Sequence, residues 1–375
     1  MIHQLANQFL INNHKVTILS PSSELPKNYI RQKIDGIDVY KFKSGKIKNT
    51  SRIKRAINES LLSVRAWFSL RSFFQKNKHD YIIYYSPSIF FGPLVWKLKK
   101  IWKVKSFLIL RDIFPRWAID NKIIREYSVI SLYFKFFEKI NYINANTIGL
   151  MSPKNLEFFN QNYKVKNKKI VLYNWISRFK IKELNKDYKE IFNLKNKVVF
   201  FYGGNIGKAQ DISAIVKLAN KMSNIPSAHF FIVGDGDNFS DIEKEIFNFD
   251  LTNITLLKTV KKDEYYQMLN QFDVGIFTLS GSHKTHNFPG KILEYLNFEK
   301  PILGLVNNGN DIKNLIESYN VGYISFSENF NEFFNNANKL LDRKERNTLK
   351  KNINRTLDET FSSNSAYKKI IKFSK

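Results

Sequence analysis

The hydrophobic and polar positions of the chain alternate between short apolar runs and longer segments whose apolar residues lie three or four positions apart. Short apolar runs are typical of buried strands, and the three-to-four spacing is typical of helices that bury one face. Because the two patterns alternate, the sequence predicts βα units, which build parallel sheets with right-handed crossovers. Helices are expected at residues 2–12, 51–74 and 127–142, and strands at residues 16–19, 39–42, 81–85, 106–110, 147–151, 170–172, 198–202, 229–233, 254–257, 274–277, 301–304 and 322–325.

A polar, charged segment at residues 177–197 separates two such series of strands. A chain of 375 residues is long enough for two domains of ordinary size. We therefore expect an α/β protein with two doubly wound, Rossmann-like domains that face a cleft, with one sheet in each domain. The expected domains are residues 1–180 and 181–361.

The chain opens with a helical pattern at residues 2–12, and its first strand pattern comes only at residues 16–19. A doubly wound domain normally opens with a strand, and the turn after that strand faces the ligand crevice. We therefore expect that codons upstream of Met1 encode this strand and a turn that contains glycine. An in-frame stop codon immediately upstream would contradict this expectation.

Composition excludes several classes of protein. The chain contains no cysteine, so disulfides, thiolate metal sites and cysteine nucleophiles are excluded. It contains no run of about 18 apolar residues, and its first residues lack a secretory signal pattern. We therefore expect a cytoplasmic protein.

The net charge of +27 is distributed unevenly. Residues 1–180 contain 33 Lys and Arg against 10 Asp and Glu, whereas the remaining residues contain 27 against 23. A general bias toward lysine would raise the charge of both halves and does not explain the difference. The asymmetry predicts a polyanionic partner for the first half, either nucleic acid or an anionic membrane surface.

The first candidate site follows the expected strand at residues 198–202. Three glycines (Gly203, Gly204 and Gly207) and Lys208 come next, and a helical pattern begins near Asp211. Glycines allow backbone N–H groups to approach an anion closely, and a lysine adds a positive charge for a diphosphate. The spacing is neither that of the dinucleotide fingerprint nor that of a P-loop, and glycines in such a turn also serve steric needs alone.

The second candidate site lies in residues 283–295, after the expected strand at 274–277. Here Pro289 and Gly290 precede a helical pattern that carries Lys291 and Glu294 on one face. A carboxylate at this position can accept hydrogen bonds from both hydroxyls of a ribose. A solvent-exposed Lys/Glu pair that only stabilises the helix would show the same spacing, but two such loops at the same end of one parallel sheet favour a binding site.

These motifs resemble glycosyltransferases of the GT-B fold, specifically glycosyltransferase family 4. The resemblance is closest to the branch that builds bacterial O-antigen and capsular polysaccharide, including N-acetyl-L-fucosamine transferases, and it covers nearly the whole chain. The motifs that carry it are YGGNIGKAQ at 202–210, VGDG at 233–236, FPGKILEY at 288–295, LRDIFP at 110–115 and LYNW at 172–175.

The resemblance implies a donor site in the second domain. The diphosphate of a nucleotide sugar would lie against the two glycine-containing loops, the ribose against Glu294, and the base against backbone after the strand at 254–257. It also implies that residues 362–375 form a helix that returns to the first domain. The donor-binding residues expected on this basis are Gly203, Gly204, Asn205, Lys208, Thr259, Val260, Pro289, Gly290, Lys291 and Glu294.

Two further residues are expected to take part in catalysis. Asp112 follows a first-domain strand, and the resemblance implies that it orients or deprotonates the acceptor hydroxyl. Without the resemblance, Asp112 is equally well explained as a surface carboxylate paired with Arg111. His286 stands where the family often has a glutamate, and there it would contact sugar hydroxyls or phosphate; a single histidine in a polar loop is more often an ordinary surface residue.

The expected activity is transfer of a hexosyl or N-acetylhexosaminyl group, including an N-acetylated deoxyhexose, from a donor that is most simply a UDP-sugar. The implied acceptor is a saccharide on polyprenyl diphosphate, and the implied course is retention at the anomeric carbon without a metal ion. Basic and bulky apolar residues alternate at 50–74 and 96–103. They suit an anionic membrane surface, so we expect a peripheral protein on the inner face of the plasma membrane.

Three different functions also fit parts of the sequence. A non-enzymatic nucleic-acid binder would explain the basic charge and the aromatic residues, which are 15% of the chain. Against it, no recognition module is readable and the glycine-containing loops lie in the less charged half, so no nucleic-acid partner is expected. The second function is that of a nucleotide-sugar epimerase of the same fold, and the third is that of a folded but inactive subunit.

Overall fold

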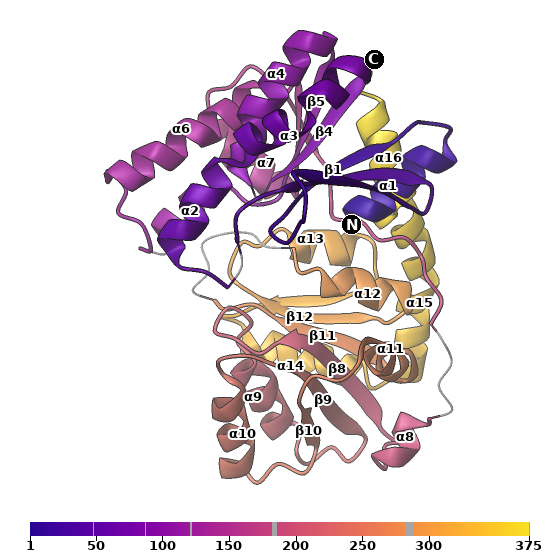
Figure 1. Cartoon of the computed structure of the whole chain (residues 1–375). Coiled ribbons are helices and arrows are strands. Elements are labelled where there is room, and N and C mark those ends of the chain that lie inside the picture. The colour runs from indigo at the N-terminus through magenta and orange to yellow at the C-terminus, as the bar shows by residue number, and fades with distance from the viewer. Residues whose placement is uncertain (48, 87, 121, 182–185, 282–287, 375) are drawn as a thin grey trace. The chain divides into compact units, whose positions relative to one another are not determined.

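The computed structural model describes residues 1–47, 49–86, 88–120, 122–181, 186–281 and 288–374. The chain forms two compact units (Figure 1). Unit 1 comprises Met1–Tyr173 and Ser363–Lys375, and unit 2 comprises Asn174–Ser362. Every strand expected from the hydrophobic pattern is present, and the sheets are built mainly from parallel strands. The predicted α/β class is therefore confirmed.

Unit 1 combines two small sheets with helices that cover them (Figure 1). Its strands are β1 (Thr17–Ser22), β2 (Tyr29–Ile34), β3 (Ile37–Lys43), β4 (Tyr81–Ser86), β5 (Lys105–Leu110), β6 (Thr147–Leu150) and β7 (Lys168–Val171). Its helices are α1 (Ile2–Ile11), α2 (Arg52–Ser60), α3 (Leu62–Lys76), α4 (Gly92–Trp102), α5 (Arg116–Asp120), α6 (Val129–Ile143), α7 (Pro153–Asn162) and α16 (Ser363–Ile371), with a 3-10 turn η1 (Ile89–Phe91).

The strands of unit 1 do not form the single sheet that the sequence analysis predicted. One sheet has the order β1-β3-β2 and the other the order β4-β5-β6-β7. β1 and β4 are edge strands of different sheets, although His79 Nε2 lies 3.0 Å from Thr17 Oγ1 near their starts. The prediction of one sheet was wrong because no strand among the described residues pairs with both β1 and β4.

The hairpin of β2 and β3 was missing from the sequence analysis. Its turn is Asp35-Gly36, and both residues have positive φ, of 48° and 82°. An Asp-Gly pair with this geometry is a strong hairpin signal. The signal was overlooked because β2 is mostly exposed and polar, so it lacks the apolar run by which the other strands were recognised.

The predicted helix at residues 51–74 is two helices, because Leu61 has ψ of −1° and interrupts the regular α-helical geometry between α2 and α3. At the other end of the chain, α16 packs against α1 within unit 1. Tyr367 contacts Phe9 with ring centroids 4.8 Å apart, and its hydroxyl lies 3.0 Å from His14 Nε2.

Unit 2 is a single parallel sheet of six strands with helices on its faces. The strands are β8 (Val198–Asn205), β9 (Ala228–Asp235), β10 (Ile254–Leu257), β11 (Val274–Thr278), β12 (Ile302–Val306) and β13 (Gly322–Phe326). The helices are α8 (Tyr188–Ile191), α9 (Ser213–Lys221), α10 (Phe239–Asn248), α11 (Lys262–Gln271), α12 (Lys291–Asn297), α13 (Ile312–Ser318), α14 (Phe330–Lys339) and α15 (Arg343–Thr356), with a π-helical turn η2 (Leu357–Phe361).

The strand order of unit 2 is β10-β9-β8-β11-β12-β13. The chain starts in the middle of the sheet at β8, moves outward to β10, and then returns to continue from β11 on the other side. This is the Rossmann order, and ligands of such sheets bind beyond the carboxyl ends of the strands where the order reverses. In unit 2 that point lies between β8 and β11.

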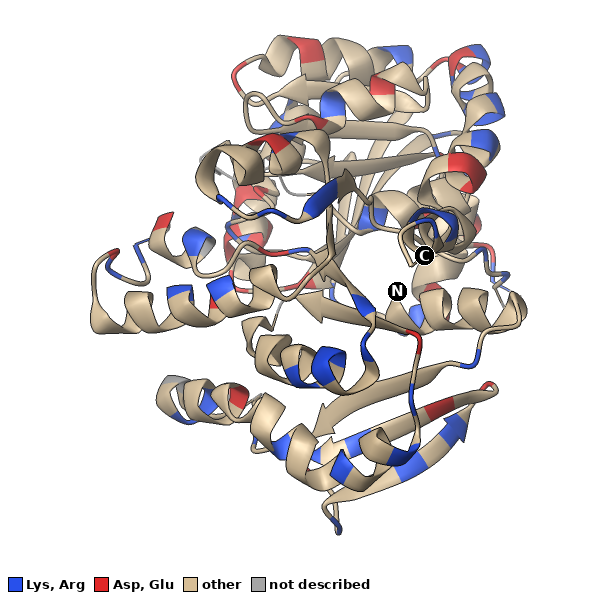
Figure 2. Cartoon of the chain, turned by 90° about the horizontal axis from the view of Figure 1, so that it is seen from above, with Lys and Arg blue, Asp and Glu red and all other residues tan. Residues whose placement is uncertain are grey.

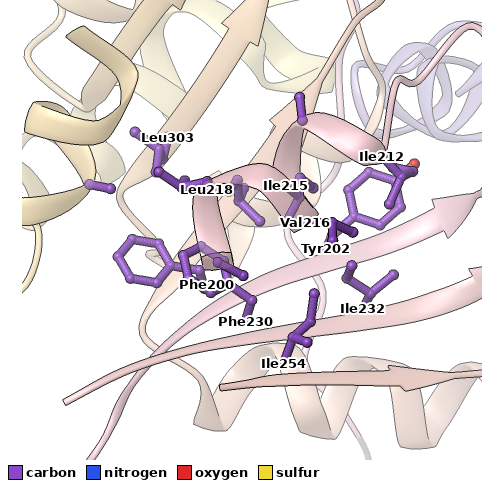
Figure 3. Close-up of a cluster of buried hydrophobic side chains, with 14 of the residues drawn as sticks. Phe200, Tyr202, Ile212, Ile215, Val216, Leu218, Phe230, Ile232, Ile254 and Leu303 are labelled. Atoms are coloured by element: carbon purple, nitrogen blue, oxygen red, sulfur yellow. The ribbon is translucent and has the colours of Figure 1, made fainter. Parts of the chain in front are cut away.

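The core of unit 2 explains why its strands read as continuous apolar runs. Phe200, Phe230 and Ile254 on neighbouring strands face Ile215 and other side chains of α9 (Figure 3). Helices also cover the opposite face of the sheet, so both faces of the central strands are buried. The glycine-containing turn after β8 is therefore held at the end of a rigid strand.

The boundary between the units lies at 173/174, whereas the sequence analysis placed it at 180/181. Residues 174–179 pack on unit 2, and Trp175 and Ile176 in this segment are buried. The amide of Ile176 donates to Phe361 O at 2.9 Å, and Arg178 forms an ion pair with Asp358 at 3.0 Å. These contacts join the segment to the end of unit 2 before the chain enters α16.

Candidate active site

The turn at the end of β8 requires its two adjacent glycines. Gly204 has φ of +137°, a conformation that residues with a Cβ rarely adopt. A methyl group on Gly203 would overlap the ring of Tyr265. The turn therefore presents bare backbone at the position where the strand order of unit 2 reverses.

The loops after β8 and β11 are joined by hydrogen bonds. The amide of Ser280 donates to Ala209 O at 3.0 Å, and the hydroxyl of Thr278 donates to Asp211 O at 3.0 Å. β8 and β11 are also direct neighbours in the sheet. The structure thus brings together the two loops that the sequence analysis proposed as halves of one site.

Lys291, the first residue of α12, extends to the turn after β8. Its Nζ lies 3.5 Å from the centroid of the Tyr202 ring and close to the position that a side chain on Gly204 would take. Burial lowers the pKa of Lys291 to about 7, although the nearby Glu294 carboxylate opposes this change. An anion that binds at the turn would favour the protonated lysine, because opposite charge stabilises the ammonium form.

Glu294 is held by two tyrosines of α11. The hydroxyl of Tyr265 donates to its Oε2 at 2.9 Å, and that of Tyr266 approaches its Oε1 at 3.4 Å. Burial raises the pKa of Glu294, and the two hydroxyls partly offset the increase. The carboxylate is therefore fixed in orientation on the same helix as Lys291, one turn away.

The sequence analysis did not identify Tyr265 or Tyr266. They precede the site in the chain and lie on a helix whose contact with α12 is a matter of tertiary packing. One feature of the sequence points toward them: α11 follows the loop that contains Thr259 and Val260, and these two residues are expected to lie against the base of the nucleotide.

The remaining expected donor-binding residues of unit 2 belong to the carboxyl end of β8, to the two loops and to the β10–α11 connection. Asn205 is exposed, and its amide donates to Gln210 Oε1 at 2.8 Å. A methyl group on Gly290 would meet no atom within 4 Å. Gly204, Lys208, Thr259 and Gly290 are exposed, Val260 and Pro289 are half-buried, and Gly203 is buried.

Asp112 belongs to unit 1 and follows β5. The neighbouring Arg111 is buried, and its guanidinium donates to Leu172 O at 2.6 Å and to Tyr173 O at 3.2 Å. The charge of Arg111 acts on Asp112, so the interpretation of Asp112 as a carboxylate paired with Arg111 stands beside its expected role at the acceptor, and neither is tested here. Desolvation by the surrounding protein raises the pKa of Asp112, and the charge of Arg111 opposes the increase.

His286 lies outside the described residues, so its role stays a prediction. In the part of the chain that the structure describes, no three His, Asp or Glu side chains are grouped so that they could hold one metal ion. The expectation of catalysis without a metal ion is not tested by this observation.

Residues 185–356 match the protein family described as glycosyl transferases group 1. The match is to a glycosyltransferase domain of this group, and it extends over slightly less than half of the chain. It covers most of unit 2, including every residue of the cluster around Lys291 and Glu294.

One curated relative is the probable glycosyltransferase WbjE of Pseudomonas aeruginosa. It is 20% identical over 222 residues, which are 58% of this chain and 55% of WbjE. The match therefore spans about half the length of that relative.

Two solved structures show the fold over nearly the whole chain. Sucrose-phosphate synthase from Thermosynechococcus elongatus aligns with a TM-score of 0.71 and 13% identity, over 99% of this chain and 91% of that one. HepE from Anabaena in complex with UDP aligns with a TM-score of 0.65 and 14% identity, over 96% and 99%. The predicted GT-B fold is confirmed.

Proposed function

We propose that the chain is a glycosyltransferase that binds a nucleotide-sugar donor in unit 2. The observation that carries the proposal is the pair on α12. A half-buried lysine lies at Gly204 and, one turn later, a carboxylate is held by two tyrosines. The lysine suits a diphosphate, and the carboxylate suits the two hydroxyls of a ribose. The group 1 domain and the likeness to a protein solved with UDP support the same conclusion.

In the proposed reaction, the bond between the anomeric carbon and the diphosphate oxygen breaks, and the electron pair leaves with the nucleoside diphosphate. The acceptor hydroxyl forms the new bond to the anomeric carbon and loses its proton. Protonated Lys291 and the exposed backbone at Gly204 would stabilise the negative charge that develops on the diphosphate. Retention of configuration and independence of a metal ion complete the proposal.

The acceptor in this proposal is a saccharide on a lipid diphosphate, and Asp112 of unit 1 orients or deprotonates its hydroxyl. Two observations support it. Asp112 is an exposed residue directly after β5, and the first half of the chain carries most of the positive charge. No helix among the described residues is long and apolar enough to cross a membrane. We place the reaction at the inner face of the plasma membrane, in the synthesis of a bacterial surface polysaccharide such as O-antigen or capsule, and N-acetylated deoxyhexoses are the first donor sugars to test.

The proposal is tested by calorimetric titration of UDP and GDP into the full chain and three variants. Lys291→Gln and Glu294→Gln are expected to weaken binding of the preferred nucleotide at least about tenfold, because each removes one charged contact. Lys244→Gln is the matched control, because Lys244 is an exposed lysine of α10 outside the cluster.

A folded wild type that binds neither nucleotide would refute the donor site. Equal binding by all three variants would show that the nucleotide lies elsewhere. Turnover of a donor sugar to an isomer without acceptor would replace the transferase with an epimerase.

A further inference from the structure

Helix α6 of unit 1 is oriented opposite to an ordinary surface helix. Its buried side chains are mainly polar or charged: Ser131, Glu138, Asn141 and Tyr142. Its exposed side chains are mainly apolar, with Val129 exposed to 83% and Phe136 to 59%. A helix in water normally buries its apolar face, so the outer face of α6 fits a non-aqueous surface.

The exposed residues of α6 form one stripe. Val129, Leu132, Phe136 and Ile143 follow one another at intervals of three, four and seven positions, and this spacing places them along a single side of the helix. The helix has 15 residues and is therefore about 22 Å long. The apolar residues exposed on α6 are Val129, Ile130, Leu132, Tyr133, Phe136 and Ile143, and Tyr127 precedes them.

The helix is held firmly in this orientation. On its half-buried flank, the ring of Phe134 lies 4.9 Å from that of Phe114, and the ring of Phe137 lies 5.0 Å from that of Phe90. On the inner face, the hydroxyl of Tyr84 in β4 donates to Asn141 O of α6 at 2.6 Å. The outward stripe is thus part of the folded unit, because turning α6 over would break these contacts.

A second exposed apolar stripe runs along α2 and α3. Ile53 and Phe68 are exposed to 75% and 67%, and Ile57, Leu61 and Val64 lie between them at intervals of three or four residues. α4 contacts both α3 and α6, and Figure 1 shows α2 and α6 on the same side of unit 1. The two stripes therefore belong to one layer of helices.

Basic residues accompany both stripes (Figure 2). On α4, Lys100 Nζ lies 4.0 Å from the ring centroid of the exposed Trp96. Among the acidic residues on these helices, Glu59 forms an ion pair with Arg55, in which Oε1 lies 2.9 Å from Nε. The exposed basic residues on α2, α3, α4 and α6 are Lys54, Arg55, Arg71, Lys76, Lys97, Lys100 and Lys139.

We propose that α6 and the α2–α3 stripe together form a surface that docks on an anionic lipid bilayer. The apolar stripes would enter the interfacial region, and the basic side chains beside them would contact lipid phosphates. Charge complementarity selects this occupant, because a second copy of the chain would bring an equally cationic face against the first. The inference stands on unit 1 alone and does not depend on the donor site.

The surface is tested by flotation of the full chain with vesicles of phosphatidylcholine alone and with added phosphatidylglycerol. The wild type is expected to float with the anionic vesicles. The double variant Val129→Ser/Phe136→Ser is expected to lower the bound-to-free ratio at least about tenfold, because it removes two of the most exposed apolar groups. Phe247→Ser is the control, because Phe247 is 84% exposed on α10 of unit 2.

A second variant covers the case in which the serine variant does not fold. The tryptophan fluorescence of the Phe136→Trp variant is expected to shift to shorter wavelength when anionic vesicles are added. Addition of UDP is expected to cause no such shift. The proposal would be overturned if the folded wild type did not bind anionic vesicles. It would also be overturned if the serine variant and the control variant bound these vesicles equally well. A concentration-dependent dimer that the serine variant abolishes would assign the surface to a second copy instead. Titration of UDP into the same samples keeps loss of the donor site distinct from loss of the docking surface.

Discussion

Glu138 is expected to make the stability of unit 1 depend on pH. Its side chain is 5% exposed, on the inner face of α6. Burial raises its pKa to about 7, from 4.5, although hydrogen bonds from Tyr163 and Tyr142 and the charge of Lys135 act in the other direction. Between these two pKa values the folded chain binds more protons than the unfolded chain at this residue. The free energy of unfolding therefore falls as the pH rises.

The size of the effect follows from the shift. One pKa unit corresponds to about 1.4 kcal/mol, so the full shift corresponds to about 3 kcal/mol, most of which is lost between pH 5 and pH 8. The contribution is present below pH 4.5 and is gone once the pH exceeds 7. Glu138→Gln keeps the shape of the side chain and cannot ionise, so the variant is expected to lack this part of the pH dependence.

The assay is urea unfolding of the wild type and Glu138→Gln at pH 5, 6, 7 and 8, followed by tryptophan fluorescence. Four of the five tryptophans lie in unit 1, so this signal reports mainly on the unit that contains Glu138. The quantity compared is the difference in free energy of unfolding between the two proteins, because other titrating groups cancel in it. A difference that does not change with pH would refute the reasoning, and would mean that water reaches the carboxylate.

Three further predictions concern the candidate donor site. Tyr265→Phe removes the 2.9 Å hydrogen bond to Glu294 and is expected to weaken UDP binding about tenfold, whereas Tyr266→Phe removes a longer contact of 3.4 Å and is expected to weaken it less. Calorimetry that shows the larger loss of affinity for Tyr266→Phe would contradict the geometry. The methyl group of Gly203→Ala would overlap the ring of Tyr265, so the variant is expected to be less stable by about 1–3 kcal/mol in denaturant unfolding. An unchanged unfolding midpoint would show that the ring moves aside without cost. UDP affinity is expected to fall as the pH rises through about 7, because Lys291 loses its proton there. Lys291→Arg is expected to remove this pH dependence, and equal pH profiles of UDP affinity for the two proteins would assign the proton to another group.

The sequence alone determined the course of the strands and the place of the two loops. Each strand except β2 contains an apolar run, and the central strands of unit 2 are apolar along most of their length because they are buried on both faces. The glycine turn after β8 is also local, since the chain itself requires glycine at Gly204. The difference in net charge between the two halves of the chain follows from the numbers of basic and acidic residues alone.

Other features depend on contacts between residues distant in the chain, which local patterns do not contain. The division of unit 1 into two sheets depends on which strand edges find partners. Tyr265 meets Glu294 only because α11 packs beside α12, and the boundary at 173/174 depends on contacts that residues 174–179 make with the end of unit 2.

Helix α6 separates the two kinds of information most clearly. Its sequence has apolar residues on nearly every side and therefore predicts a helix without predicting which face is buried. The tertiary structure buried the face that carries Glu138 and Tyr142 and left Val129 and Phe136 exposed. The sequence determines that a helix forms because that depends on local spacing. Its orientation depends on the neighbours against which it packs, and only the folded chain supplies them.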